Sequence, residues 1–258
     1  MKAIWGYIWI LLITLFLLSL YSFAPHPIKI GNLEIKQTHF KQFLLGDTTK
    51  VDALVAIDIT WKRPQLDTNS QIILLIGDSM LEQLRYAMQD YCDYNGHKLY
   101  VVMWYSSTTL YYGKSDTLKY FINKFKPTYV ILVLGANELF VPNIKEKRAK
   151  YVKNIISQID TLPFVWVGPP NWKKDSGIND LIYSFVGRNN FFPSYKFTMD
   201  PSFKRFKDGA HPTYSSAYRW MDSLAIWIEN ASAHPIKMKK PPFEKKKHSH
   251  LTILQPLN

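Results

Sequence analysis

Short apolar runs alternate with longer amphipathic stretches from residue 71 onward. The apolar runs are QIILLIG (71–77), KLYVVMW (98–104), TYVILVLG (128–135) and FVWVGPP (164–170). The stretches between them are LEQLRYAMQDYCDYNG (81–96), SDTLKYFINKFK (115–126) and KEKRAKYVKNIISQID (145–160). Apolar runs of about four to eight residues are typical of strands covered on both faces. Gly96 and Pro127 mark helix ends ahead of the next strand. The pattern therefore predicts a β-α-β-α-β-α-β order with a parallel sheet.

The segments that follow complete a single domain. Residues 176–188 have the pattern of a fourth helix, a short strand is expected near 194–198, and a final helix is expected to begin at Pro212. A chain of 258 residues with 47% apolar residues suits one sizeable core. We predict one α/β domain over 71–233, a three-layer structure with helices on both faces of a flavodoxin-like sheet of order 2-1-3-4-5. The sequence contains no dinucleotide-binding or Walker phosphate loop, and no cofactor is predicted.

The N-terminus carries an uncharged run, IWGYIWILLITLFLLSLYSFA (4–24). As a helix this run reaches roughly 30 Å, the thickness of the hydrocarbon core of a bilayer. Its length and the following Pro25 favour an uncleaved transmembrane anchor over residues 1–24 rather than a signal peptide or a buried core helix. Residues 25–70 are expected to form a stalk or a small β-rich lead-in.

The charges flanking this run do not favour a location of the following domain outside the cytoplasm. Lys2 precedes the run, whereas Lys29, Lys36 and Lys41 follow it closely, which locally favours a cytoplasmic body. Large domains can nevertheless be translocated regardless of flanking charge. The flanking charges alone therefore do not determine the orientation, and the expected substrate favours a catalytic domain outside the cytoplasm.

The chain is strongly basic, with a net charge of +12. Such a charge suits nucleic acid, anionic lipid or an acidic glycan as a partner. No nucleic-acid recognition motif accompanies it, so a nucleic-acid partner is not predicted. Residues 234–258 are rich in lysine and proline and are expected to form a basic, mobile arm. The His248-x-His250 pair in this arm and the single Cys92 lack ligand partners at metal-site spacing, so no metal is predicted.

Polar residues that can carry chemistry follow the predicted strands. Ser79 follows the first strand and Asn137 follows the third, while Asp208 and His211 of KDGAHPTY come just before the closing helix. Strands one and three are neighbours in the predicted order, and the carboxyl ends of parallel strands meet at one edge of a sheet. We therefore expect Ser79 and Asn137 to face each other.

These motifs carry a family resemblance. GDS (77–79), GANE (135–138) and DGAH (208–211), in this order, resemble the first, third and fifth blocks of the SGNH (GDSL-like) hydrolase superfamily, in particular its membrane-anchored bacterial esterases and O-acetyltransferases. The resemblance covers roughly residues 71–230. It implies that Ser79 is a nucleophile, that His211 accepts its proton and that Asp208 orients the imidazole. It also implies an oxyanion hole formed by the Ser79 N–H and the Asn137 side-chain amide.

The second block departs from the family pattern. A glycine normally follows the second strand, where this chain has MWYSSTTLYYG (103–113). A main-chain N–H at Ser106 or Ser107 could replace the glycine donor, provided that the turn keeps its geometry. Glu138 stands where the family usually has aspartate, and we expect it to be structural rather than catalytic. Asp78 is expected to stabilise the turn.

Each candidate also has a plain structural interpretation. Ser79 could cap the following helix, His211 could lie on the surface, and the Asn137 side chain could close a turn. Aromatic residues near the predicted strand ends could stack on sugar rings or simply pack against loops. They are Trp104, Tyr105, Tyr111, Tyr112 and Trp172.

The leading hypothesis is a membrane-anchored serine esterase outside the cytoplasmic membrane, acting on O-acyl groups, in particular O-acetyl groups, of a cell-envelope carbohydrate. An O-acetyltransferase would use the same first step, because water or a sugar hydroxyl can release an acyl-enzyme. A third hypothesis is a catalytically weak glycan-binding partner of a membrane acyltransferase. The carbohydrate assignment depends on analogy with the anchored relatives.

Overall fold

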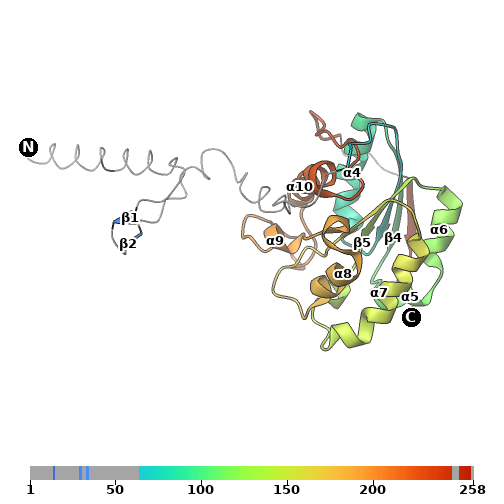
Figure 1. Ribbon diagram of the computed structural model, residues 1–258, viewed down its shortest axis with the longest axis horizontal. Helices are drawn as coiled ribbons and strands as arrows, with labels where there is room; N and C mark the ends of the chain where they lie inside the picture. Colours follow the sequence, from blue (N-terminus) through green and yellow to red (C-terminus); the bar gives the residue numbers. More distant parts are fainter. Residues whose placement is uncertain (1–13, 15–28, 31–32, 35–63, 246–249, 257–258) are drawn as a thin grey trace, which may run out of the picture. The chain divides into compact units, whose positions relative to one another are not determined.

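The computed structural model describes residues 14, 29–30, 33–34, 64–245 and 250–256, and the chain divides into two compact units, Met1–Ala53 and Leu54–Asn258 (Figure 1). In the first unit, Thr14 is helical and the two short strands β1 (Lys29–Ile30) and β2 (Leu33–Glu34) pair antiparallel. The predicted anchor over 1–24 lies outside the described residues apart from Thr14. Within the described residues, no helix has the length and apolar character needed to cross a bilayer.

The second unit is built on a six-stranded parallel sheet. Its strands are β3 (Ile72–Gly77), β4 (Lys98–Trp104), β5 (Tyr129–Val133), β6 (Phe164–Val167), β7 (Phe191–Phe192) and β8 (His250–Leu254). Strands β3, β4 and β5 are almost entirely buried, as the apolar runs predict. The parallel α/β architecture is therefore confirmed.

Helices cover both faces of the sheet, because successive side chains of a strand point to opposite sides. Ile73 and Leu75 of β3 contact the core beneath α4 (Leu81–Asn95) and α10 (Tyr214–Ala231). Leu74 and Ile76 contact the second core, beneath the helices of the opposite layer (Figure 1). Those helices are α5 (Thr109–Lys114), α6 (Thr117–Phe125), α7 (Ile144–Ile159) and α8 (Ile178–Val186).

The strand order differs from the predicted one. The sheet runs β7-β6-β5-β3-β4-β8, so a sixth strand is added beside β4 to the five that were expected. This strand comes from the basic C-terminal segment, with Tyr100–Trp104 of β4 paired to His250–Leu254. The neighbouring positions of β3 and β5, on which the site depends, are as predicted.

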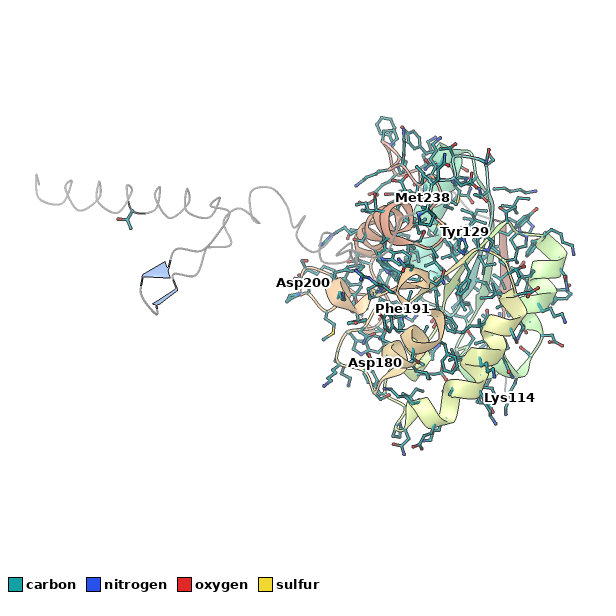
Figure 2. All side chains as sticks on the ribbon, in the orientation of Figure 1. Lys114, Tyr129, Asp180, Phe191, Asp200 and Met238 are labelled. Carbon is teal, nitrogen blue, oxygen red and sulfur yellow. The ribbon has the colours of Figure 1, made fainter. Side chains whose placement is uncertain are left out.

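The described part of the C-terminal segment is packed rather than a mobile arm. Ile236 and Met238, the latter labelled in Figure 2, are buried, and the Lys237 N–H donates to the Asp67 carbonyl at 3.0 Å. The His97 ring nitrogen Nε2 lies 2.6 Å from the Lys237 carbonyl oxygen. The expectation failed because apolar residues alternate with the lysines here, so this segment buries one side while its charges remain in solvent.

Two local assignments also differ. Residues 194–198, expected to be a strand, contain the helix α9 (Tyr195–Thr198), and the strand of this region is β7 instead. The final helix begins at Tyr214, with the Thr213 side chain accepting a hydrogen bond from the Ser216 N–H. The short helices η1 (Ala136–Glu138) and η2 (Arg188–Asn190) complete the unit.

Candidate active site

Ser79 lies in the tight turn between β3 and α4. A Cβ atom on Gly77 would lie 1.8 Å from the Val133 carbonyl oxygen, so only glycine allows β3 and β5 to approach this closely where β3 ends. The Asp78 N–H donates to the same carbonyl at 3.0 Å. Ser79 is thereby held at the carboxyl end of β3, largely buried and next to β5.

Asp208 and His211 lie on a short hairpin between α9 and α10. The Phe206 N–H donates to the His211 carbonyl at 2.9 Å, and Arg205 forms an antiparallel bridge with Pro212. Gly209 at its tip has φ 71°, which glycine adopts without steric cost. Asp208 and His211, three residues apart in the sequence, are thus brought together by the turn at the tip of this hairpin.

The structure brings the three predicted triad residues together. His211 Nε2 lies 2.9 Å from Ser79 Oγ, although the two residues are 132 positions apart in the sequence. His211 Nδ1 lies 2.7 Å from Asp208 Oδ2. Both distances are within hydrogen-bonding range, so a continuous serine–histidine–carboxylate chain is formed.

The charge of Asp208 determines which ring nitrogen of His211 carries the proton. The Ala210 N–H bond to Asp208 Oδ1 lowers the pKa of the Asp208 carboxyl, and the His211 side chain and N–H lower it further. An ionised carboxylate only accepts hydrogen bonds, so Nδ1 of a neutral His211 carries the proton. Nε2 is then the acceptor for the Ser79 hydroxyl, which is the arrangement a general base requires.

Asp78 connects the two loops that form the site. Its side chain accepts hydrogen bonds from the N–H groups of Met80 at 3.0 Å and of Gly135 and Ala136 at 3.2 Å. Burial raises the pKa of this carboxyl to about 6, against these hydrogen bonds and the nearby His211, which lower it. Asp78 is thus placed as the expected turn-stabilising residue.

Asn137 lies next to the β4–α5 loop, where the second oxyanion donor is expected. Its exposed side chain donates through Nδ2 to the Ser107 carbonyl at 2.9 Å, which leaves the second amide hydrogen for another acceptor. Ser106 has φ 56°, the left-handed conformation that glycine favours. The Ser107 N–H is used within the turn, since it donates to the Trp104 carbonyl at 3.2 Å. Ser106 is therefore better placed than Ser107 to supply a main-chain donor.

Glu138 is buried and joins three elements. Its Oε2 accepts from the Thr109 N–H at 2.6 Å, its Oε1 accepts from the Thr109 hydroxyl at 3.1 Å, and it forms an ion pair with Arg148 of α7. It therefore fixes the start of α5 against η1 and thus the positions of the two loops around Asn137. Thr109 and Arg148 were not singled out from the sequence.

Arg205 holds the hairpin against the rest of the site. Its guanidinium donates to the carbonyls of Ala210 at 2.5 Å, Pro170 at 2.9 Å, Asn171 at 2.8 Å and Thr198 at 3.0 Å. Partial burial lowers the pKa of Arg205 to about 10, so it remains charged at neutral pH. Sequence analysis missed it, because nothing in KRFKDGAH distinguishes Arg205 from its neighbouring cations.

The aromatic candidates for a sugar-binding surface separate into two groups. Trp104 and Tyr112 are buried and contact each other edge to face, and the Trp104 indole N–H donates to the Gln255 carbonyl, so both are core residues. Tyr105, Tyr111 and Trp172 are partly exposed. Trp172 lies against Phe140, with ring centroids 5.5 Å apart.

A cavity of about 540 Å³ lies apart from the triad. It is lined by polar residues of the β6–α8 loop, α8 and α9, including Asn171, Asp175, Asn179 and Tyr195, and by none of the three triad residues. No cluster of histidine, cysteine and carboxylate side chains within the described residues could hold a metal ion. His250 packs against Tyr100 and Phe125 in β8, and His248 lies outside the described residues.

No protein-family model and no curated protein sequence matches the chain. Among solved structures, it is similar to the psychrotrophic esterase EstA from Pseudoalteromonas sp., in a form inhibited by monoethylphosphonate. The TM-score is 0.45 and the identity 17%, over 62% of this chain and 99% of that one. The function is therefore inferred below from the site of this chain itself.

Proposed function

We propose that this protein is a serine esterase of the SGNH (GDSL-like) type. The observation that carries the proposal is the hydrogen-bonded chain from Ser79 Oγ through the His211 ring to Asp208. A serine hydroxyl is a weak nucleophile until a base accepts its proton, and this chain supplies the base and its orienting carboxylate.

The proposed reaction follows from these positions. Ser79 Oγ attacks the ester carbonyl carbon as its proton passes to His211 Nε2, giving a tetrahedral intermediate. The oxyanion is stabilised by the main-chain N–H groups of Ser79 and Ser106 and by the side-chain amide of Asn137. His211 then returns the proton to the leaving alcohol oxygen, the C–O bond breaks, and an acyl-Ser79 remains. Water, activated by His211, attacks the acyl carbon, the bond to Ser79 Oγ breaks, the carboxylic acid is released, and His211 returns a proton to Ser79.

The substrate we propose is an O-acyl group, in particular O-acetyl, on a carbohydrate of the cell envelope. Two observations support a polymer-borne ester. The Asp208 and His211 side chains are 49% and 28% exposed, so the site opens to solvent and can receive a group attached to a chain. Tyr105, Tyr111 and Trp172 remain partly exposed and can stack on sugar rings. The run over residues 4–24 would anchor the enzyme in the membrane, with its catalytic unit outside the cytoplasm.

Purified full-length protein in detergent tests the reaction with p-nitrophenyl acetate. We expect turnover that falls roughly 10³- to 10⁶-fold in Ser79→Ala and in His211→Ala. Ser184→Ala, which removes an exposed hydroxyl on α8, should leave turnover unchanged. Equal rates in all four proteins would overturn the proposal and favour a glycan-binding role.

A covalent probe identifies the nucleophile independently of rate. A fluorophosphonate should add one phosphonyl group to wild-type protein, and peptide mass analysis should place it on Ser79. Incubation of the enzyme with a mixture of acetylated and unacetylated envelope oligosaccharides then distinguishes two outcomes. Hydrolysis releases acetate, whereas transfer moves the acetyl group to a second sugar. Labelling at another serine with Ser79 unmodified would contradict the assigned nucleophile.

A further inference from the structure

A lysine-rich surface covers the outer side of α5, α6 and α7. We call it the lysine face and define it by the exposed residues Lys114, Lys119, Lys124, Lys147, Lys150 and Lys153. The three helices together carry eight cationic side chains and one carboxylate, Glu146. Asp116 and Asp160 lie at helix ends beside this face. The face therefore keeps a clear excess of positive charge.

The lysine face is one continuous surface. Gln158 of α7 accepts from the Lys119 N–H at the start of α6 and donates to the Tyr112 and Ser115 carbonyls of α5 and its C-cap. The Tyr151 ring lies between two of the lysines, 6.0 Å from Lys114 Nζ and 4.9 Å from Lys150 Nζ. In Figure 2, Lys114 projects from the same side of the unit as α6 and α7.

Within the described part of the chain, none of the six lysines has a carboxylate partner within ion-pair distance. Lys147, Lys150 and Lys153 follow each other at three-residue spacing along α7, where like charges repel. Gathering them without counter-charges opposes folding, and an anionic partner would relieve this repulsion.

The two helices on the opposite face of the sheet are net acidic. Helices α4 and α10 together carry five carboxylates and two cations. Lys240 of the C-terminal segment pairs with one of these carboxylates, Asp222. The uncompensated excess of lysines on α5, α6 and α7 therefore has no counterpart in α4 and α10.

We infer that the lysine face docks onto the anionic lipid surface of the membrane. Lysines with long apolar stems beside an exposed tyrosine are the side chains found at membrane–water interfaces. Tyr120, 57% exposed, lies beside Lys124, whose Nζ is 5.7 Å from the ring centroid. This inference concerns a surface that contains none of the proposed catalytic residues, and it does not depend on the esterase activity.

Full-length protein reconstituted into vesicles tests this inference. A fluorophore is placed on α6 at Asn123→Cys, or on α10 at Ile226→Cys, because native Cys92 is buried and escapes labelling. The vesicles consist of phosphatidylcholine with or without phosphatidylglycerol and carry a quencher on the lipid headgroup. We expect strong quenching at position 123 only with phosphatidylglycerol, weak quenching at position 226, and loss of the difference in high salt.

Charge reversal provides the matched comparison. Lys119→Glu, Lys124→Glu and Lys150→Glu in one protein should shift the docked–undocked equilibrium by at least about 100-fold and abolish the lipid-dependent quenching. Lys98→Glu, Lys196→Glu and Lys239→Glu change the net charge equally at exposed positions off the lysine face and should retain it. Thermal unfolding of both variants checks that they are folded. Equal quenching at positions 123 and 226, or equal quenching with neutral lipid, would overturn the inference.

Binding of a soluble acidic polysaccharide to the lysine face, with no response to phosphatidylglycerol, would also overturn it. Esterase activity of the charge-reversed protein on p-nitrophenyl acetate should be unchanged. Failure of docking and failure of the proposed catalysis therefore give separate results.

Discussion

At the scale of single residues, the most informative position is Ser106, which adopts a glycine-like conformation without being glycine. A left-handed conformation costs a residue with a side chain roughly 1–2 kcal/mol. Ser106 nevertheless holds this conformation, with φ 56°. It lies in the β4–α5 loop, where the next residue, Ser107, accepts a hydrogen bond from the Asn137 side chain. The simplest physical account is that the main-chain direction, and not the side chain, is required there.

Substituting Ser106 tests whether the donor is main-chain or side-chain. Ser106→Gly should keep esterase activity and change the free energy of unfolding by less than about 1 kcal/mol, because relief of strain offsets the added freedom of the unfolded chain. Ser106→Val should lose activity and stability, because a β-branched side chain tolerates this conformation poorly. Steady-state kinetics and urea unfolding give both quantities. Loss of activity in the glycine variant would show that the Ser106 hydroxyl itself acts.

Asp78 makes stability depend on pH in a defined direction. Burial raises the pKa of this carboxyl from 3.8 to about 6 in the folded protein, so between these values the folded state holds more protons than the unfolded state. Stability contributed by this group therefore falls as pH rises from about 4 to 6. The lowered pKa of Asp208 acts in the opposite direction, so a comparison with a variant is needed.

Asp78→Asn removes this titration and leaves Asp208 in place. Its amide would face the N–H groups of Gly135 and Ala136, so we expect a loss of about 1–3 kcal/mol. Urea unfolding should show that the advantage of wild type over Asp78→Asn shrinks as pH rises to about 6 and is constant above it. An advantage that grows with pH would contradict the assigned cause.

At the scale of elements, what could be predicted depended on how strongly each segment is buried. Strands β3, β4 and β5 are covered on both faces and appear in the sequence as unbroken apolar runs. Strand β8 is half exposed and only five residues long, and it follows a run of lysines, so its pattern is hidden by composition. Strand β7 has two residues and gives no periodic signal.

The candidate site was predictable to a similar, limited extent. Ser79, Asn137, Asp208 and His211 follow strands or precede the last helix, so their order along the chain implies convergence at one edge of the sheet. Arg205 acts through four main-chain carbonyls, which any residue provides, so no sequence pattern reveals it. The Trp104 indole N–H donates to the Gln255 carbonyl just beyond β8, a contact that depends on a strand that was not predicted.

Removing β8 tests its contribution to stability. A chain ending at Lys245 leaves the edge of β4 unpaired and removes the acceptor of the Trp104 indole N–H. We expect a loss of about 2 kcal/mol or more in the free energy of unfolding and increased aggregation, because an open strand edge pairs with other chains. A chain ending at Gln255 keeps β8 and should behave as wild type. Thermal unfolding with light scattering measures both effects, and equal stability of the two truncations would contradict the role of β8.

At the scale of the whole molecule, two features of the chain oppose each other. The proposed substrate lies outside the cytoplasm, and the apolar run over residues 4–24 would hold the catalytic unit at the membrane. Lys29, Lys36 and Lys41, directly after this run, favour retention of the following domain inside. A large folded domain is less sensitive to such charges than a short loop, so we expect translocation to prevail.

Reporter fusions after Asn258 decide the orientation. Alkaline phosphatase, which is active only outside the cytoplasm, should be active in the fusion, and removal of residues 4–24 should move the protein to the soluble cytoplasmic fraction without phosphatase activity. Lys29→Gln, Lys36→Gln and Lys41→Gln together should raise the translocated fraction, because they remove the opposing charges. An inactive phosphatase fusion that remains in the membrane fraction would place the catalytic unit in the cytoplasm. The proposed envelope substrate would then be out of its reach, whereas the triad and the lysine face could still act on cytoplasmic esters and on the inner lipid surface.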